Sequence, residues 1–136
     1  MQISRKYQVS NLAGSSRDGQ RVYINSLLPE CMTLKDGRVV YTDKYLAMHE
    51  MSEKIFMDVF GYKYDYAHEL ATKMEREAVE ADGVPWKEYQ EYMLKMVKKL
   101  HTITGEEPPD LDLEPEIDTH ENKELAVYAH WCQHAH

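Results

Sequence analysis

Residues 43–83, DKYLAMHEMSEKIFMDVFGYKYDYAHELATKMEREAVEADG, decide the fold of this chain. Apolar residues recur there at helical spacing, and each run ends at a glycine. The pattern predicts a helix over residues 43–60, with Asp43 as its candidate cap, and a second helix over residues 64–81. Because the link Gly61-Tyr62-Lys63 is so short, the two helices are expected to be antiparallel neighbours.

The sequence on either side of this stretch predicts a third helix and a small sheet. Pro85 suits the first turn of a helix that runs to about Leu100. Upstream, residues 21–25 are β-branched and aromatic and indicate a strand, whereas the small polar run 11–19 indicates a loop. Asp36-Gly37 separates two further apolar segments, which is typical of a β-hairpin.

These elements indicate an α+β protein. We expect a small N-terminal antiparallel β-sheet, then a three-helix region, then an acidic C-terminal tail. Residues 1–104 are predicted to form a single α+β domain, which agrees with the usual size of one domain. Residues 105–136 are predicted to be an acidic linker followed by a short C-terminal helix.

Composition excludes several classes of protein. The chain has 136 residues, 43% of them hydrophobic and 29% charged, which is typical of a globular domain. No basic stripe is present, so we expect no nucleic acid as partner. No apolar run is long enough for a membrane helix, and the N-terminus lacks the apolar core of a signal peptide. The two cysteines, Cys31 and Cys132, form no disulfide framework, and free thiols fit a reducing compartment, so the expected location is cytoplasmic.

The net charge of −8 is concentrated in the tail. Residues 106–136 contain nine Asp and Glu against one Lys. One interpretation is a solvated stretch in which residues 106–118 lack regular structure. The other is a nucleic-acid mimic that binds a basic partner. His130, Cys132, His134 and His136 at the end of the tail could also bind a metal adventitiously.

Polar residues stand where the two central helices should be apolar. On the first helix, His49 and Glu53 fall in the middle of the apolar face, and Glu50 lies at its margin. On the second helix, His68 and Glu75 fall on the packed side. Since a buried carboxylate without a partner is costly, these groups need a cation, a hydrogen-bond donor or a metal.

Antiparallel pairing brings these four groups together. Reflection through the turn places Glu75 level with His49, and His68 within one helical turn of Glu53. Two imidazoles with one or two carboxylates form a ligand set for zinc, with iron or manganese as alternatives. The same residues could instead form a structural polar network.

The segment His49-Glu50-Met51-Ser52-Glu53, followed by His68, resembles the metal site of zincin-like metallopeptidases. Those enzymes carry His-Glu-x-x-His on a helix, and here Glu53 stands where the second histidine would be. The resemblance implies a zinc-dependent hydrolase that acts on peptide or amide bonds of a peptide or protein substrate. It implies His49, Glu53 and His68 as ligands and Glu50 as the catalytic base.

A second resemblance covers the wider run from Tyr45 to Tyr89. It includes Tyr66-Ala67-His68 and Trp86-Lys87-Glu88-Tyr89, and it is similar to small uncharacterised proteins of bacteria and their phages. The rival function is therefore a non-catalytic phage or bacterial interaction protein, with a structural His/Glu cluster and a partner-binding acidic tail. A carboxylate-bridged site of the helix-bundle kind ranks last, because Glu-x-x-His is missing from the buried positions. The oligomeric state is left open.

Overall fold

The computed structural model describes residues 2–9, 11–100 and 107–112. In chain order the elements are β1 (Gln2–Ser4), β2 (Ala13–Ser15), β3 (Arg21–Ile24), β4 (Cys31–Thr33), β5 (Val39–Tyr41), α1 (Asp43–Asp58), α2 (Tyr64–Ala81) and α3 (Trp86–Leu100). The α+β class and the three helices are confirmed. The predicted C-terminal helix and the His130 to His136 cluster lie outside the described residues.

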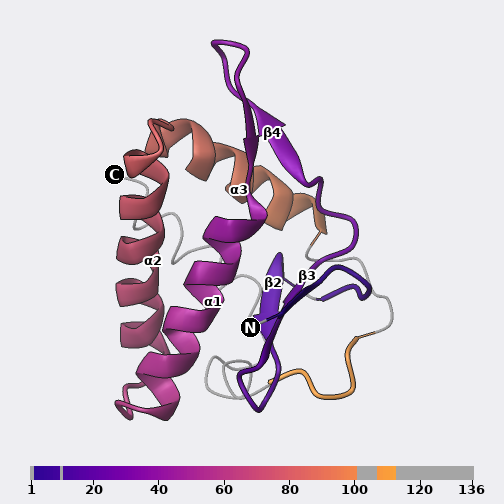
Figure 1. Ribbon diagram of the computed structural model, residues 1–136, viewed down its shortest axis with the longest axis vertical. Coiled ribbons are helices and arrows are strands. Elements are labelled where there is room, and N and C mark those ends of the chain that lie inside the picture. Colours follow the sequence, from indigo (N-terminus) through magenta and orange to yellow (C-terminus); the bar gives the residue numbers. More distant parts are fainter. Residues whose placement is uncertain (1, 10, 101–106, 113–136) are drawn as a thin grey trace.

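The strands form two small sheets, and one of these sheets is mixed (Figure 1). In the larger sheet β3 lies in the middle, antiparallel to β2 and parallel to β1. The prediction of a purely antiparallel sheet missed this parallel pair. The prediction of a loop over residues 11–19 is wrong for Ala13–Ser15, because pairing with β3 organises a segment whose own side chains favour a loop. The hairpin of β4 and β5 around Gly37 is confirmed, and Gly37 has the positive φ that such a turn requires.

The helix α1 is the centre of the domain. It packs against α2 on one side and against β2 and β3 on the other, as Figure 1 shows. Gly61, with φ of 71°, turns the chain between α1 and α2. Ala67 and Ala71 of α2 are completely buried, so the two helices can approach closely. α3 closes the core with a stripe of buried residues: Trp86, Tyr89, Met93, Met96, Val97 and Leu100.

The prediction that Asp43 is the N-terminal cap of α1 is wrong. Thr42 occupies the capping position, and Asp43 lies in the first turn. Both carboxylate oxygens of Asp43 accept hydrogen bonds from the Arg5 guanidinium, at 2.6 and 2.7 Å. The same guanidinium donates to the carbonyl oxygen of Leu28, at 2.7 Å. Asp43 thus ties the start of the helix to the N-terminal segment, an interaction that local sequence could not reveal.

The segment 107–112 packs against the sheet, so this described part of the tail is not the solvated stretch that we expected, although it contains only a turn and one β-bridge and neither helix nor strand. The backbone of Leu111 forms a bridge with Ser16, and its side chain packs with Val9 and Tyr23 in a small second core. A Cβ atom at position 14 would come within 2.8 Å of Leu111 Cδ1, so Gly14 leaves room for this leucine. Charge composition predicted a solvated linker, but the buried side chain of Leu111 packs against residues of the sheet.

The ion pair between Lys54 of α1 and Asp112 adds to this attachment, with Nζ 2.6 Å from Oδ2. The Tyr23 hydroxyl also donates to Asp110. The segment therefore joins the sheet to α1. Among the described residues, none of the helices is both long enough and apolar enough to cross a membrane.

Replacing Leu111 tests whether this segment is part of the fold. Leu111 is 6% exposed, and we expect Leu111→Ala to lower the free energy of unfolding by about 2–4 kcal/mol, since a buried methyl-rich side chain is lost. Leu27→Ala is the matched control, because Leu27 is 46% exposed. Urea unfolding of both variants measures the difference. Equal, small effects would show that the segment does not contribute to the stability of the domain.

Candidate metal centre

Four polar side chains meet in the interface between α1 and α2. His49 and Glu53 lie one turn apart on α1, and His68 and Glu75 lie two turns apart on α2. Their exposed fractions are 5%, 7%, 2% and 0%, so the interface excludes bulk water from all four. The structure therefore confirms that these positions are buried and close together.

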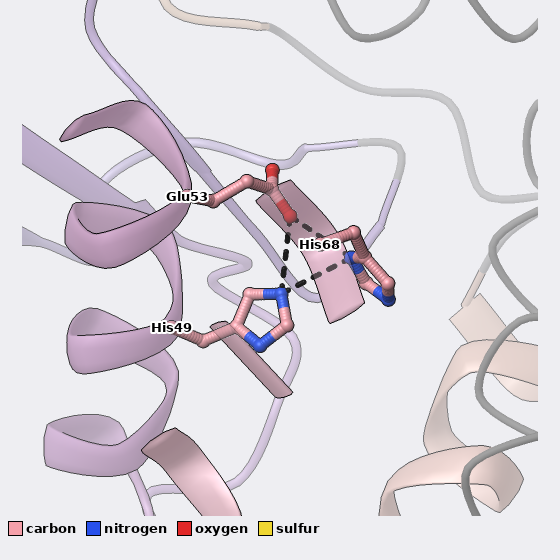
Figure 2. Close-up of side chains that lie close together, drawn as sticks. All are labelled: His49, Glu53 and His68. Atoms are coloured by element: carbon pink, nitrogen blue, oxygen red, sulfur yellow. Dashed lines mark hydrogen bonds and ion pairs between the residues drawn. The ribbon is translucent and has the colours of Figure 1, made fainter. Parts of the chain in front are cut away.

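Three of these residues converge on one point (Figure 2). His49 Nε2 lies 3.2 Å from Glu53 Oε2 and 3.2 Å from His68 Nδ1. His68 Nδ1 lies 2.9 Å from the same oxygen of Glu53. The two imidazole rings meet at an interplanar angle of 65°, which lets one nitrogen of each ring point at the shared centre.

Glu75 has a different position from the one that a fourth ligand would need. Its Oε1 lies 2.7 Å from His49 Nδ1, the nitrogen on the opposite side of the ring from the three-atom group. Its Oε2 accepts a hydrogen bond from the Tyr89 hydroxyl of α3, at 2.5 Å. Glu75 therefore lies close to the other three residues, as expected, but the expectation that it is a fourth metal ligand does not fit its position: it contacts the far nitrogen of His49, outside the group that could hold an ion.

His49 and Glu53 share a strong electrostatic coupling. Burial alone lowers the pKa of His49, but the hydrogen bonds and charges of Glu53 and Glu75 outweigh it and raise the pKa well above 6.5. Burial raises the pKa of Glu53, but the two imidazoles outweigh it and lower the pKa to about 2. In the absence of a metal, His49 is therefore a cation next to the Glu53 carboxylate at neutral pH.

His68 behaves differently from His49. Burial lowers its pKa below 6.5, with only partial compensation from Glu53. A neutral imidazole is the form that binds metals. The backbone carbonyl of His68 accepts a hydrogen bond from the Thr72 hydroxyl, at 2.8 Å. The Tyr64 hydroxyl lies 3.5 Å from His68 Nδ1. Burial, together with the charges of Glu53 and Glu50, raises the pKa of Tyr64 well above 10.0.

Glu50 is half-buried and lies beside the three-residue group without joining it. Its charge contributes to the raised pKa of Tyr64, whose ring packs near that of His68. The helical period predicts Glu50 at the margin of the apolar face, and its partial burial agrees with this.

The group His49, Glu53 and His68 could hold a metal ion. A tetrahedral zinc ion with bonds of about 2.0–2.1 Å sets its ligand atoms about 3.3 Å apart. The observed separations of 2.9 to 3.2 Å differ from this by a few tenths of an ångström. Small side-chain adjustments would therefore suffice. Iron(II) or manganese(II) accept the same donors, so the geometry leaves the identity of the ion open.

Tyr64, Thr72 and Tyr89 also contact residues of this cluster, although no sequence pattern assigns them to it. The sequence pattern places Tyr89 on the apolar stripe of α3, where core packing explains it. The one feature of the sequence that points to a further role is the Tyr89 hydroxyl, because a buried tyrosine hydroxyl needs a hydrogen-bond partner. The identity of that partner, Glu75 on another helix, could come only from the packed structure.

No protein-family model matches this chain, and no curated protein or solved structure matches it. The resemblance to zincin-like metallopeptidases thus stays a prediction. The function must be argued from the site itself.

The pKa of Glu53 predicts how acid affects the metal-free protein. A carboxylate whose pKa falls from 4.5 to about 2 on folding stabilises the fold above pH 4.5, and this contribution is lost as the pH falls toward 2. In that pH range, Glu53 should change the free energy of unfolding of the parent protein by up to about 1.4 kcal/mol per pH unit. We expect Glu53→Gln to remove this contribution to the slope. Urea unfolding in the presence of a chelator measures the slope.

Glu80→Gln, at an exposed position of α2, is the control for this experiment. It should keep the slope of the parent protein. An unchanged slope in Glu53→Gln would mean that the Glu53 carboxylate is not held by the two imidazoles.

Proposed function

We propose that this protein is a metal-dependent hydrolase, and that His49, Glu53 and His68 bind its zinc ion. The observation that carries the proposal is the triangle of one carboxylate oxygen and two imidazole nitrogens, separated by 2.9 to 3.2 Å. Two histidines and one carboxylate are a ligand set of catalytic zinc sites. Three protein ligands leave the fourth position of a tetrahedral ion for a water molecule or a substrate.

Charge supports a metal in this place. The lowered pKa of Glu53 keeps its buried side chain an anionic carboxylate, and without a metal the protonated His49 is its counter-charge. A divalent ion bound by Glu53 would supply this counter-charge when His49 gives up its proton and becomes a neutral ligand. Because uncompensated buried charge is costly, the site favours the cation.

Glu50 is the proposed general base. It follows His49 directly, is half-buried, and contributes by its charge to the raised pKa of Tyr64. When bound, zinc supplies a water of lowered pKa and polarises a carbonyl group. Glu50 would take a proton from that water and pass it to the leaving amine. Tyr64, which its high pKa keeps protonated, could donate a hydrogen bond on the same side. The proposed substrate is a peptide or amide bond.

A specific observation favours a second candidate, the interaction protein with a structural cluster. The distances within the triangle are also hydrogen-bond distances, so a shared proton can occupy the place of the ion. In this reading the cluster fixes the packing of α1 on α2. The acidic tail would then bind a basic partner, although most of it lies outside the described residues.

Metal content separates the two candidates. Protein purified without a histidine tag should contain about one equivalent of zinc, iron or manganese. His49→Ala and His68→Ala should each lose it, because a ligand is removed. Elemental analysis is the measurement. The control replaces His130, His134 and His136 with Asn, which should leave the metal content unchanged. A parent protein without metal, even after incubation with zinc, would rule out the hydrolase.

Glu50→Gln tests catalysis separately from metal binding. The substitution keeps size and hydrogen-bonding shape but removes the base, so the metal content should stay the same. Turnover of a metal-dependent activity, identified first with a peptide library, should fall by about a hundredfold or more. The control is Glu80→Gln on the exposed face of α2, which should keep full activity. Undiminished turnover in Glu50→Gln would remove Glu50 from the mechanism.

A further inference from the structure

We infer that Tyr89 of α3 is a positioning residue of the metal centre: through Glu75 it fixes the ring of His49 so that Nε2 faces the ion. The inference rests on the proposed metal site and extends it by a residue that binds neither metal nor substrate. It makes the third helix a part of the site.

The contacts of Glu75 carry the first step. Its side chain is completely buried, and each of its two oxygens has a different partner. Oε1 accepts from His49 Nδ1 at 2.7 Å, and Oε2 accepts from the Tyr89 hydroxyl at 2.5 Å. Two bonds in two directions fix both the position and the rotation of the carboxylate. A carboxylate held by only one of them could turn about its last bond.

The second step concerns the nitrogen that is left for the metal. Because Glu75 accepts a hydrogen bond from Nδ1–H, the neutral His49 ring keeps its proton on Nδ1 and its lone pair on Nε2. Nε2 is the atom that faces Glu53 Oε2 and His68 Nδ1 at 3.2 Å. Such outer partners of a ligand histidine fix its tautomer and orientation, and their loss typically weakens metal binding.

The third step is that Tyr89 is itself held rigidly. Its side chain is completely buried, stacks on Trp86 and meets the ring of Tyr45 edge-on at 5.5 Å. The Tyr45 hydroxyl in turn donates to Asp82, at the end of α2. Burial and the charge of Glu75 raise the pKa of Tyr89, so it remains a donor at neutral pH. The hydroxyl therefore approaches Glu75 from a fixed direction.

Tyr89→Phe removes only the hydroxyl and keeps the ring that packs on Tyr45 and Trp86. The measurements are the dissociation constant of zinc, by competition with a chromophoric chelator, and the visible spectrum of the cobalt(II)-substituted protein. We expect zinc to bind about 10-fold to 100-fold more weakly, with altered cobalt bands. Tyr92→Phe is the matched control on the same helix, half-buried and one turn further on, and it should bind zinc as the parent does.

A double-mutant cycle with Glu75→Gln shows whether Tyr89 acts through Glu75. If it does, the double variant binds zinc hardly more weakly than Glu75→Gln alone. Additive losses would overturn the inference, because they would mean that Tyr89 contributes only to general packing. Each zinc affinity is compared with the urea stability of the same metal-free variant, so that a folding defect is recognised.

The outcomes distinguish this inference from the proposed function. A parent protein that binds zinc, with a Tyr89→Phe variant of equal affinity and identical cobalt spectrum, overturns the role of Tyr89 and leaves the metal site standing. A parent protein that binds no zinc overturns both. If Tyr89→Phe does not fold, the affinity and cobalt spectrum of Glu75→Gln decide, since the same chain of contacts predicts that both change.

Discussion

The burial of two carboxylates and two imidazoles between α1 and α2 is the constraint on which the rest of the structure depends. Removing a charged group from water costs several kcal/mol unless partners compensate it. Here the compensation comes from opposite sides of one interface: Glu53 is held by both imidazoles, and Glu75 by His49 and Tyr89. A shift of α2 along α1 by one residue would separate these pairs. The cluster thus helps to specify the register of the two helices.

The remaining elements keep this interface closed. Gly61 lets the chain turn back immediately, and two buried alanines bring the helices close enough for side chains of α1 to reach α2. α3 covers one end of the cluster and supplies the Tyr89 hydroxyl. β2 and β3 support the opposite face of α1, and the segment 107–112 is attached to both the sheet and α1. The domain is organised around α1.

The two imidazoles, alike in sequence, have different chemical roles because their surroundings differ. His49 lies between two carboxylates, so its pKa is raised and it holds a proton when no metal is bound. His68 has one carboxylate partner in a buried site, so its pKa is lowered and it stays neutral. An ion entering this site would exchange with the proton of His49 and meet His68 already in its binding form.

Local spacing and backbone preference are enough to predict the helices, the turn at Gly61, the hairpin at Gly37 and the polar residues on buried faces. The helical period and the short connection also predict that His49, Glu53 and His68 lie close together. The packed structure was needed to show that Glu75 contacts the far nitrogen of His49, that Tyr89 donates to Glu75, that β1 pairs in parallel with β3 and that Leu111 is buried. These features join residues far apart in the chain. Whether such residues meet depends on the free energy of packing the whole domain, which no local pattern records.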